Sequence, residues 1–264
     1  MHHSRLFTDE QEVQIAKMYL EGKSERQLER DLKVSRDCIH GALCRQKVEF
    51  RSPAERNRLY QVNASAFDII DSEHKAYFLG LIYADGSVTK RSLSFSQKRQ
   101  DRVLVERLKV FLQSEHPLND VMQKCEGKEY PQTRFYATER HLAGRLKTLG
   151  VLPKRPRHDL VTSAITPELE RHFIRGYFDG DGCAHKRPRM GISFVGQLGL
   201  LEWIRNRFIY MGVSKKDAPI TKHAKSDIYY LVYLSKKQGV PIAQEMYRDA
   251  TTWLERKRER TESW

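Results

Sequence analysis

Two apolar segments of the sequence each end in a carboxylate followed by a glycine. The first spans residues 77–86 and contains Asp85 next to its end, and the second spans residues 172–182 and contains Asp181 in the same place. Each segment also carries two small residues four positions apart, which fall on one face of a helix: Gly80 with Ala84, and Gly176 with Gly180. The residue types therefore indicate two helices that each deliver an acid to their carboxyl end.

A face of small residues lets two helix backbones come into contact. We expect the two helices to pack on each other through Gly80 and Gly176, so that Asp85 and Asp181 arrive side by side. Hard divalent cations prefer oxygen ligands, so a pair of carboxylates is a ligand set for such a cation. The glycine after each acid is expected to act as a helix C-cap that lets the chain turn away.

These segments resemble the nine-residue signature of the LAGLIDADG homing endonucleases, closely over residues 79–86 and more loosely over 174–182. Two copies in one chain, each followed by a similar series of elements, make the resemblance specific. In that family the last acid of each signature binds catalytic metal, which implies this role for Asp85 and Asp181. Asp179, at position six, has a tyrosine as its counterpart in the first copy and is expected to be a polar helix-end residue, not a shared ligand.

The resemblance also implies the fold class, an α+β protein with two pseudo-twofold-related αββαββα halves that present antiparallel sheets to DNA. We place the first half at residues 72–153, an inter-half linker at 154–165 and the second half at 166–264. A single last helix is expected from Pro241 to Arg258. Seven side chains are expected to contact DNA from the two sheets: Ser92, Ser94, Ser96 and Arg134 in the first half, and Arg189, Lys222 and Lys225 in the second.

The amino-terminal residues 1–50 read as a separate small domain. Three short helical patterns follow one another, and two of them begin with a capping box, in which a serine or threonine is followed three residues later by glutamine. This layout resembles a helix-turn-helix, whose third helix enters the major groove of DNA. Residues 51–71 are expected to form a linker. The expected DNA contacts of this region are Arg36, Asp37, His40 and Arg45 on the third helix, with Arg51 on the linker.

The charge balance favours a polyanionic partner. The chain of 264 residues contains 47 Lys and Arg against 34 Asp and Glu, a formal net charge of +13, and such an excess suits nucleic acid. The sequence contains no transmembrane or signal pattern, so we expect a soluble, intracellular protein in the cytoplasm or nucleoid of a bacterial or phage-infected cell. Its four cysteines lack the spacing of a zinc site or a disulfide framework.

Phosphodiester hydrolysis by two metal ions is the chemistry that these residues suggest. Mg²⁺ is the expected ion, with Mn²⁺ or Ca²⁺ able to replace it for binding, and backbone carbonyls near Ala84 and Gly180 are expected to add ligands. The resemblance implies further residues that order the attacking waters around the metals: Gln97, Lys98, Gln197, Lys154 and Lys257. Gly196 stands where the first half has Gln97, so the two active sites are expected to differ.

The sequence thus predicts a monomeric, site-specific endonuclease for double-stranded DNA, encoded by a mobile element such as an intron. Two other functions stay open at this stage. One is a DNA-binding regulator on a catalytically silent endonuclease fold, and retention of both acids argues against it. The other is an RNA maturase that binds its host intron RNA, an activity some members of the family have acquired.

Overall fold

The computed structural model describes residues 6–50, 60–125, 127–152, 158–186, 190–214, 218–224 and 226–264. The chain divides into two compact units, residues 1–59 and 60–264, and each is described by itself. In the described part of the chain, no helix has the length and apolar character needed to cross a membrane.

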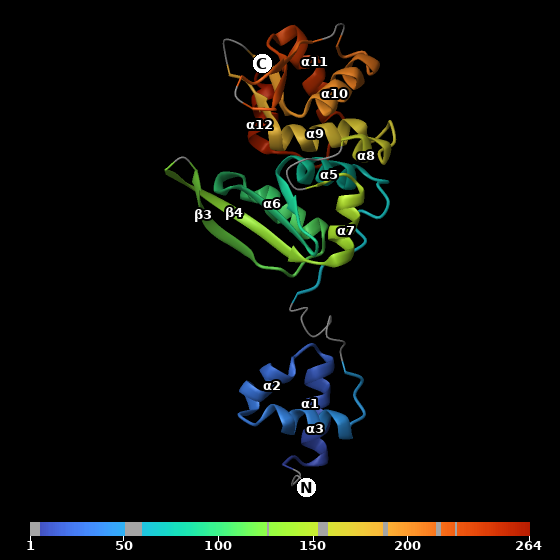
Figure 1. Cartoon of the computed structure of the whole chain (residues 1–264), viewed down its shortest axis with the longest axis vertical. Coiled ribbons are helices and arrows are strands. Elements are labelled where there is room, and N and C mark those ends of the chain that lie inside the picture. Colours follow the sequence, from blue (N-terminus) through green and yellow to red (C-terminus); the bar gives the residue numbers. More distant parts are fainter. Residues whose placement is uncertain are drawn as a thin grey trace. The chain divides into compact units, whose positions relative to one another are not determined.

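The described residues of the smaller unit, 6–50, form three helices: α1 (Asp9–Leu20), α2 (Glu25–Leu32) and α3 (Arg36–Arg45). Both predicted capping boxes are confirmed, because Thr8 with Gln11 and Ser24 with Gln27 exchange side-chain and backbone hydrogen bonds. The helices, drawn in blue in Figure 1, enclose a small apolar core. Its buried members are Ile15, Ala16, Tyr19, Leu28, Ile39, Ala42 and Leu43.

The larger unit uses the same order of elements twice. The first half comprises α5 (Glu73–Asp85), β1 (Gly86–Val88), β2 (Ser92–Lys98), the 3₁₀ turn η1 (Arg99–Asp101), α6 (Arg102–Phe111), β3 (Leu118–Cys125), β4 (Lys128–Thr138) and α7 (Arg140–Thr148). The second half comprises α8 (His158–Ser163), α9 (Glu170–Asp181), β5 (Gly182–Ala184), β6 (Ile192–Gly196), α10 (Leu198–Tyr210), β7 (Ile220–Lys222), β8 (Tyr229–Tyr233), α11 (Lys236–Tyr247) and α12 (Glu255–Glu262).

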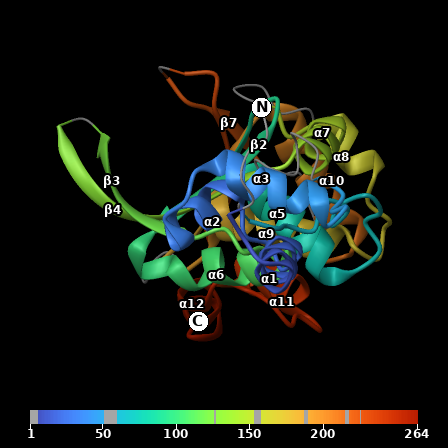
Figure 2. The same ribbon diagram turned by 90° about the horizontal axis from the view of Figure 1, so that it is seen from below.

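Both sheets are antiparallel and have the same strand order, β1-β2-β4-β3 in the first half and β5-β6-β8-β7 in the second. Helices α5 and α9 lie against each other in the middle, with the two sheets on either side of the pair (Figure 1). The long β3–β4 hairpin curves away from the rest of the first sheet (Figure 2). The predicted α+β fold class with two antiparallel sheets is confirmed.

Two expectations about helix and linker boundaries were wrong. Within the segment expected to be a linker, Ala66, Phe67 and Ile70 are buried in the core of the larger unit. The expected single last helix is two helices, because the chain leaves α11 after Tyr247 and passes through a left-handed residue, Asp249, at φ 55° before α12 begins. No glycine or proline marks that break in the sequence.

The central helix pair is held together by direct backbone contact. A Cβ atom added at Gly80 would collide with the carbonyl oxygen of Phe173, and one added at Gly176 would collide with the carbonyl oxygen of Tyr77. Backbone atoms on both sides of the contact cannot move aside as a flexible side chain can. The absence of a Cβ at these two positions therefore sets the distance between α5 and α9.

A buried cation on α9 ties the helix pair to the carboxyl-terminal segment. Arg175 is fully buried and donates hydrogen bonds to Glu73 at 2.6 Å, to the Met246 carbonyl at 2.9 Å and to the Thr252 carbonyl at 3.1 Å. Its guanidinium also contacts Nδ1 of His172 at 2.8 Å. Burial and the neighbouring arginine lower the pKa of His172 to about 4, so this imidazole is neutral near pH 7 and accepts from Arg175.

We predict that Gly80→Ala destabilises the larger unit by about 3 kcal/mol or more, because the new methyl group overlaps backbone atoms that cannot be repacked. The measurement is thermal or urea unfolding of the purified variant. Gly144→Ala is the matched control, since Gly144 lies in helix α7 with nothing within 4 Å of an added Cβ. This control is expected to be neutral or stabilising by up to about 1 kcal/mol. Equal stability of the two variants would contradict the backbone contact.

Candidate functional site

The two acids lie next to each other at the carboxyl ends of the central helices. Asp85 is the last residue of α5 and Asp181 is the last residue of α9. A Cβ added at Gly180 would lie 2.7 Å from Oδ2 of Asp85 and would collide with the side chain of Ala84. Gly180 thus leaves the space that the Asp85 carboxylate occupies beside the end of the other helix.

The glycines after the acids are the C-cap residues of α5 and α9, as expected, but their backbone conformation is not the one that usually favours glycine there. Gly86 has φ −83° and ψ 152°, and Gly182 has φ −96° and ψ 165°, so both are extended and neither is a left-handed C-cap. A Cβ at Gly86 would collide with Ile82, and one at Gly182 with Phe178. Space, not backbone conformation, requires glycine where each helix passes directly into the first strand of its sheet.

The pKa values of both acids are raised, so their surroundings disfavour two negative charges at this place. Burial, and then the negative charge of Asp85, raise the pKa of Asp181 to about 7, while the cation of Lys257 opposes the rise. Burial also raises the pKa of Asp85, against the effects of a hydrogen bond from Gln97 and of Lys257. A divalent cation would relieve this repulsion, and two half-buried carboxylates supply the hard oxygen ligands that Mg²⁺ prefers. The residues present therefore fit such an ion.

The donor set is incomplete without other ligands. Within the described residues, no group of three or more His, Cys, Asp and Glu gathers at one place. The Gly180 carbonyl, expected to add a metal ligand, instead accepts a hydrogen bond from Lys257 at 3.3 Å. This oxygen already faces a cation, so it is poorly placed for a metal. Water or a bound substrate must complete the coordination of any ion held by Asp85 and Asp181.

Gln97 contacts the first acid, and among the described residues of the second half no side chain makes the equivalent hydrogen bond to Asp181. Its Nε2 donates to Oδ2 of Asp85 at 2.7 Å. Phe95 pairs with Gly86 and Phe194 pairs with Gly182, so Gly196 takes the register position of Gln97, and Gln197 takes that of Lys98.

A tyrosine hydroxyl occupies the corresponding space in the second half. A Cβ at Gly196 would collide with the hydroxyl oxygen of Tyr177, which donates to the Val195 carbonyl. Burial raises the pKa of Tyr177 well above its ordinary value, so this hydroxyl keeps its proton. The two acids therefore have chemically different neighbours.

Lys257 closes the carboxyl end of α9. Its side chain is buried, and its Nζ donates to the carbonyls of Asp179 at 2.8 Å and Gly182 at 2.7 Å, and also to those of Phe178 and Gly180. An ammonium group has three N–H bonds, so these four acceptors use all of them. Burial lowers the pKa of Lys257 to about 8. The expected role in ordering water does not agree with this geometry, because no donor is left for water.

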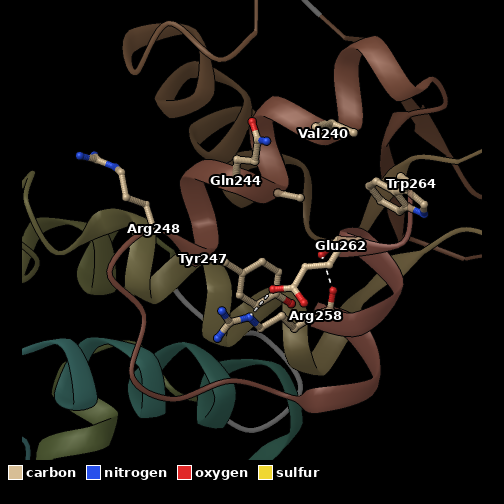
Figure 3. Close-up of a pocket in the computed structure, with 9 residues that line it drawn as sticks. Val240, Gln244, Tyr247, Arg248, Arg258, Glu262 and Trp264 are labelled. Atoms are coloured by element: carbon tan, nitrogen blue, oxygen red, sulfur yellow. Dashed lines mark hydrogen bonds and ion pairs between the residues drawn. The ribbon is translucent and has the colours of Figure 1, made fainter.

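An open pocket of about 340 Å³ lies beside the first acid. It is lined by residues from both halves, including two from α12 of the second half: Asp85, Ser96, Gln97, Lys98, Asp101, Gln132, Gly180, Gly182, Arg256 and Lys257. A second pocket, of about 400 Å³, lies between α11 and α12 and contains none of the residues singled out from the sequence (Figure 3). The polar pocket beside Asp85, although smaller, is the one where the candidate chemistry lies.

Comparisons with known proteins give a fold and no sequence relative. No protein-family model matches the chain, and no curated protein matches it. Among solved structures it is similar to the homing endonuclease I-WcaI bound to its DNA recognition sequence, with 14% identity and a TM-score of 0.52, over 72% of this chain and 87% of that one. The chain has the homing endonuclease fold.

Two further similar structures have lower TM-scores. The LAGLIDADG homing endonuclease I-LtrWI bound to target DNA is 11% identical, with a TM-score of 0.45, over 75% of this chain and 88% of that one. The I-SmaMI LAGLIDADG homing endonuclease bound to cleaved DNA is 13% identical, with a TM-score of 0.41, over 73% and 87%. The match to I-WcaI confirms, at the level of the fold, the resemblance found from the two signatures.

In the homing endonuclease fold of this chain, one face of the first sheet is polar and open. Ser94, Ser96 and Lys98 alternate along β2, and Ser96 pairs with Arg134 on β4, whose Nε donates to its hydroxyl at 3.2 Å. Ser92 was expected on this face, but it is only 3% exposed, and its hydroxyl shares a hydrogen bond with Thr89 at 2.6 Å in the turn before β2.

Strand pairing adds two residues to this face that the sequence analysis missed. Gln132 pairs with Lys98, and the exposed Tyr136 pairs with Ser94. Only the register between β2 and β4 reveals them. In the second half, Lys222 is exposed and forms an ion pair with Asp227 at 3.1 Å. Four expected site residues lie outside the described residues: Arg51, Lys154, Arg189 and Lys225.

Two of the expected contacts on α3 are held within the smaller unit. Arg45 pairs at 2.8 Å with the fully buried Glu12 of α1. His40 contacts Glu25 at 2.7 Å and stacks on Phe50. Arg36 and Asp37 are exposed at the start of α3. Arg45 therefore stabilises the helix packing, and the exposed amino end of α3 is the better candidate for contact with a ligand.

We predict that Lys257→Met lowers the thermal unfolding temperature, because it leaves the last carbonyls of α9 without their donor, at a cost of about 2 kcal/mol. Lys98→Met is the control, since this exposed lysine lines the same pocket without a buried partner, and it is expected to change stability by less than about 0.5 kcal/mol. Differential scanning calorimetry checks both variants. If Lys257→Met melts with the wild type, Lys257 does not hold the helix end.

Proposed function

We propose that the protein is a magnesium-dependent, site-specific endonuclease that acts as a monomer and cuts both strands of a long DNA target. The observation that carries this proposal is the position of Asp85 and Asp181, side by side at the ends of two helices in backbone contact. The homing endonuclease fold and the net charge of +13 support it. I-WcaI was solved with its DNA recognition sequence, and we infer that this chain also binds double-stranded DNA.

Asp85 and Asp181 would hold the divalent ions. Bound there, such ions lower the pKa of a coordinated water and stabilise charge on the phosphoryl and leaving oxygens. Mg²⁺ fits because it binds through few carboxylates and keeps water and phosphate ligands. Mn²⁺ and Ca²⁺ would bind the same oxygens.

The remaining residues of the site orient the acids and the substrate. Gln97 fixes the carboxylate of Asp85 by its hydrogen bond, and Lys257 fixes the end of α9 that carries Asp181. Lys98 and Arg134 provide positive charge on the open face of the first sheet, where phosphates and base edges would lie. Gln197 is the N-cap residue of α10 in the second half and would act from the opposite side.

We predict that Asp85→Asn and Asp181→Asn each abolish double-strand cleavage and leave DNA affinity within a few-fold of the wild type, because each removes a metal ligand without changing the sheets. The measurement begins by sequencing the ends released from a randomised duplex library with Mg²⁺, with EDTA as the control. Each variant is then tested on the recovered target with a different label on each strand. Uncut second strands would show that each acid serves one strand.

Three outcomes would contradict part or all of this proposal. Wild-type cleavage by either variant would remove that acid from the mechanism. Enrichment of a bound duplex without metal-dependent breaks would favour a DNA-binding regulator, and binding of structured RNA in preference to that duplex would favour a maturase.

We further propose that the smaller unit binds DNA through α3 in the manner of a helix-turn-helix, giving the protein a second address on its target. The exposed Arg36 begins this helix, where side chains of such domains reach base edges. It is expected to contact a base or a phosphate.

We predict that Arg36→Ala weakens binding to the recovered target by about tenfold, the usual effect of losing one arginine contact. Lys17→Ala is the control, because Lys17 is an exposed cation on α1 of the same unit, and it is expected to leave affinity within about twofold. Fluorescence anisotropy at fixed salt measures both. Equal affinities for the two variants would show that α3 does not read the target.

A further inference from the structure

The segment between α11 and α12 connects the second half back to the first. We call residues 251–257, the end of this segment and the first residues of α12, the C-terminal strap. On the first half, Thr251 donates to Glu73 through its backbone and its hydroxyl, both at 2.7 Å, and the Trp253 carbonyl accepts from Arg107 of α6 at 2.7 Å. The strap is therefore fixed on the surface of the half to which it does not belong in sequence.

The strap also carries an arginine, Arg256, that is held by a buried acid of the first half. Nε and Nη2 of Arg256 both bind the carboxylate of Asp101, with shortest distances of 2.8 Å. Asp101 is 2% exposed, whereas the arginine side chain is 37% exposed. Among the described residues, no hydrogen bond involves Nη1. The buried Asp101 thus fixes the guanidinium group of Arg256, and its Nη1 still has N–H donors that can bind another group.

This guanidinium shares a pocket with the first acid. The 340 Å³ pocket beside Asp85 is also lined by Arg256 and by the exposed Lys98. An arginine whose fork is already oriented loses little side-chain entropy when it binds an anion, and guanidinium N–H groups match phosphate oxygens closely. The pocket therefore combines a carboxylate that would hold a cation with two basic side chains. This combination can bind the phosphate of a phosphodiester.

We propose that Arg256 binds a backbone phosphate of the DNA strand cut at Asp85, so that the C-terminal strap of the second half completes the first active site. This inference rests on the proposed endonuclease function. The contact serves one strand only, because its anchor has no counterpart in the other half. Asp101 is the third residue after β2, whereas residues 197–201, which follow β6, are Gln, Leu, Gly, Leu and Leu and contain no acid.

The same helix supplies a matched control. Arg258 is also on α12 and has a similarly exposed side chain, 28% against 37%. It pairs with Glu262 at 2.7 Å, stacks over Trp253 at 3.9 Å and lines the other pocket, between α11 and α12 (Figure 3). Arg256→Gln and Arg258→Gln therefore remove the same charge from the same helix, but only the first removes it from the pocket beside Asp85.

The test measures the affinity of the full chain, in Ca²⁺, for the recovered duplex with single methylphosphonates that neutralise one phosphate at a time. The wild type is expected to lose affinity at each phosphate that a cation contacts, and by about tenfold at the phosphate that Arg256 binds, the effect of one charge-assisted contact. We expect that phosphate within a few nucleotides of the break that Asp85→Asn suppresses. Arg256→Gln is expected to bind the unmodified duplex about tenfold more weakly and to be insensitive at that position. Arg258→Gln is expected to behave as the wild type.

Two features keep the test decisive. Glutamine at position 256 can still donate to Asp101, so the variant is expected to fold, and its melting curve checks this. If the variant does not fold, the affinity losses of the wild type decide the test. A single anchored arginine predicts a loss at a phosphate beside the break made at Asp85 and no loss at the matching phosphate of the other strand.

The outcomes separate this inference from the function on which it rests. If the wild type cleaves DNA but Arg256→Gln is sensitive to the same methylphosphonates as the wild type, the inference is wrong and the endonuclease stands. The same holds if the wild-type affinity losses are equal at matching phosphates of the two strands. Binding without cleavage, in which the sensitivity still depends on Arg256, overturns the proposed endonuclease and leaves the phosphate contact standing.

Discussion

The contact between the backbones of α5 and α9 is the constraint on which the rest of the larger unit depends. Gly80 and Gly176 remove the side chains that would separate the two helices, and Gly180 removes one that would displace Asp85. Two acids come together because the helices that carry them touch, and the raised pKa of Asp181 follows from that proximity and from burial. The same contact places the two sheets on either side of the helix pair, so one geometric condition fixes both the site and the surfaces around it.

Around this near-symmetric centre, the two halves have diverged. Residues related by the helix contact include Leu79 and Arg175, and in the second half the arginine gathers Glu73, His172 and the C-terminal strap into a buried network. Tyr83 has Asp179 as its counterpart, and this acid is 1% exposed and accepts hydrogen bonds from Tyr77 and from the Leu254 backbone. The second helix thus binds the carboxyl-terminal chain through Arg175 and Asp179, whereas the first helix binds it through Glu73 at its amino end. A duplicated fold in this way supports two unequal chemical environments at Asp85 and Asp181.

Local patterns in the sequence were sufficient to predict the repeated halves, both capping boxes and the alternating strand β2, because each depends on residues a few positions apart. Asp179, at position six of the second signature, was expected not to be a shared metal ligand, and it is buried among hydrogen-bond donors. Long-range pairs could not be predicted in this way. Arg256 and Asp101 are 155 residues apart in the sequence. Nothing in the residues near Arg175 distinguishes this buried arginine from an exposed one. The break between α11 and α12 was missed because hydrogen bonds to Glu73, far away in sequence, replace the expected glycine or proline.

The most direct measurement of the central claim is anomalous diffraction from crystals of the protein with its recovered duplex, grown in Mn²⁺. The account predicts manganese peaks at the ends of α5 and α9, with carboxylate oxygens of Asp85 and Asp181 among the ligands and DNA phosphate oxygens completing the coordination. Peaks at other carboxylates, with Asp85 and Asp181 bound to no metal and away from the DNA backbone, would contradict it.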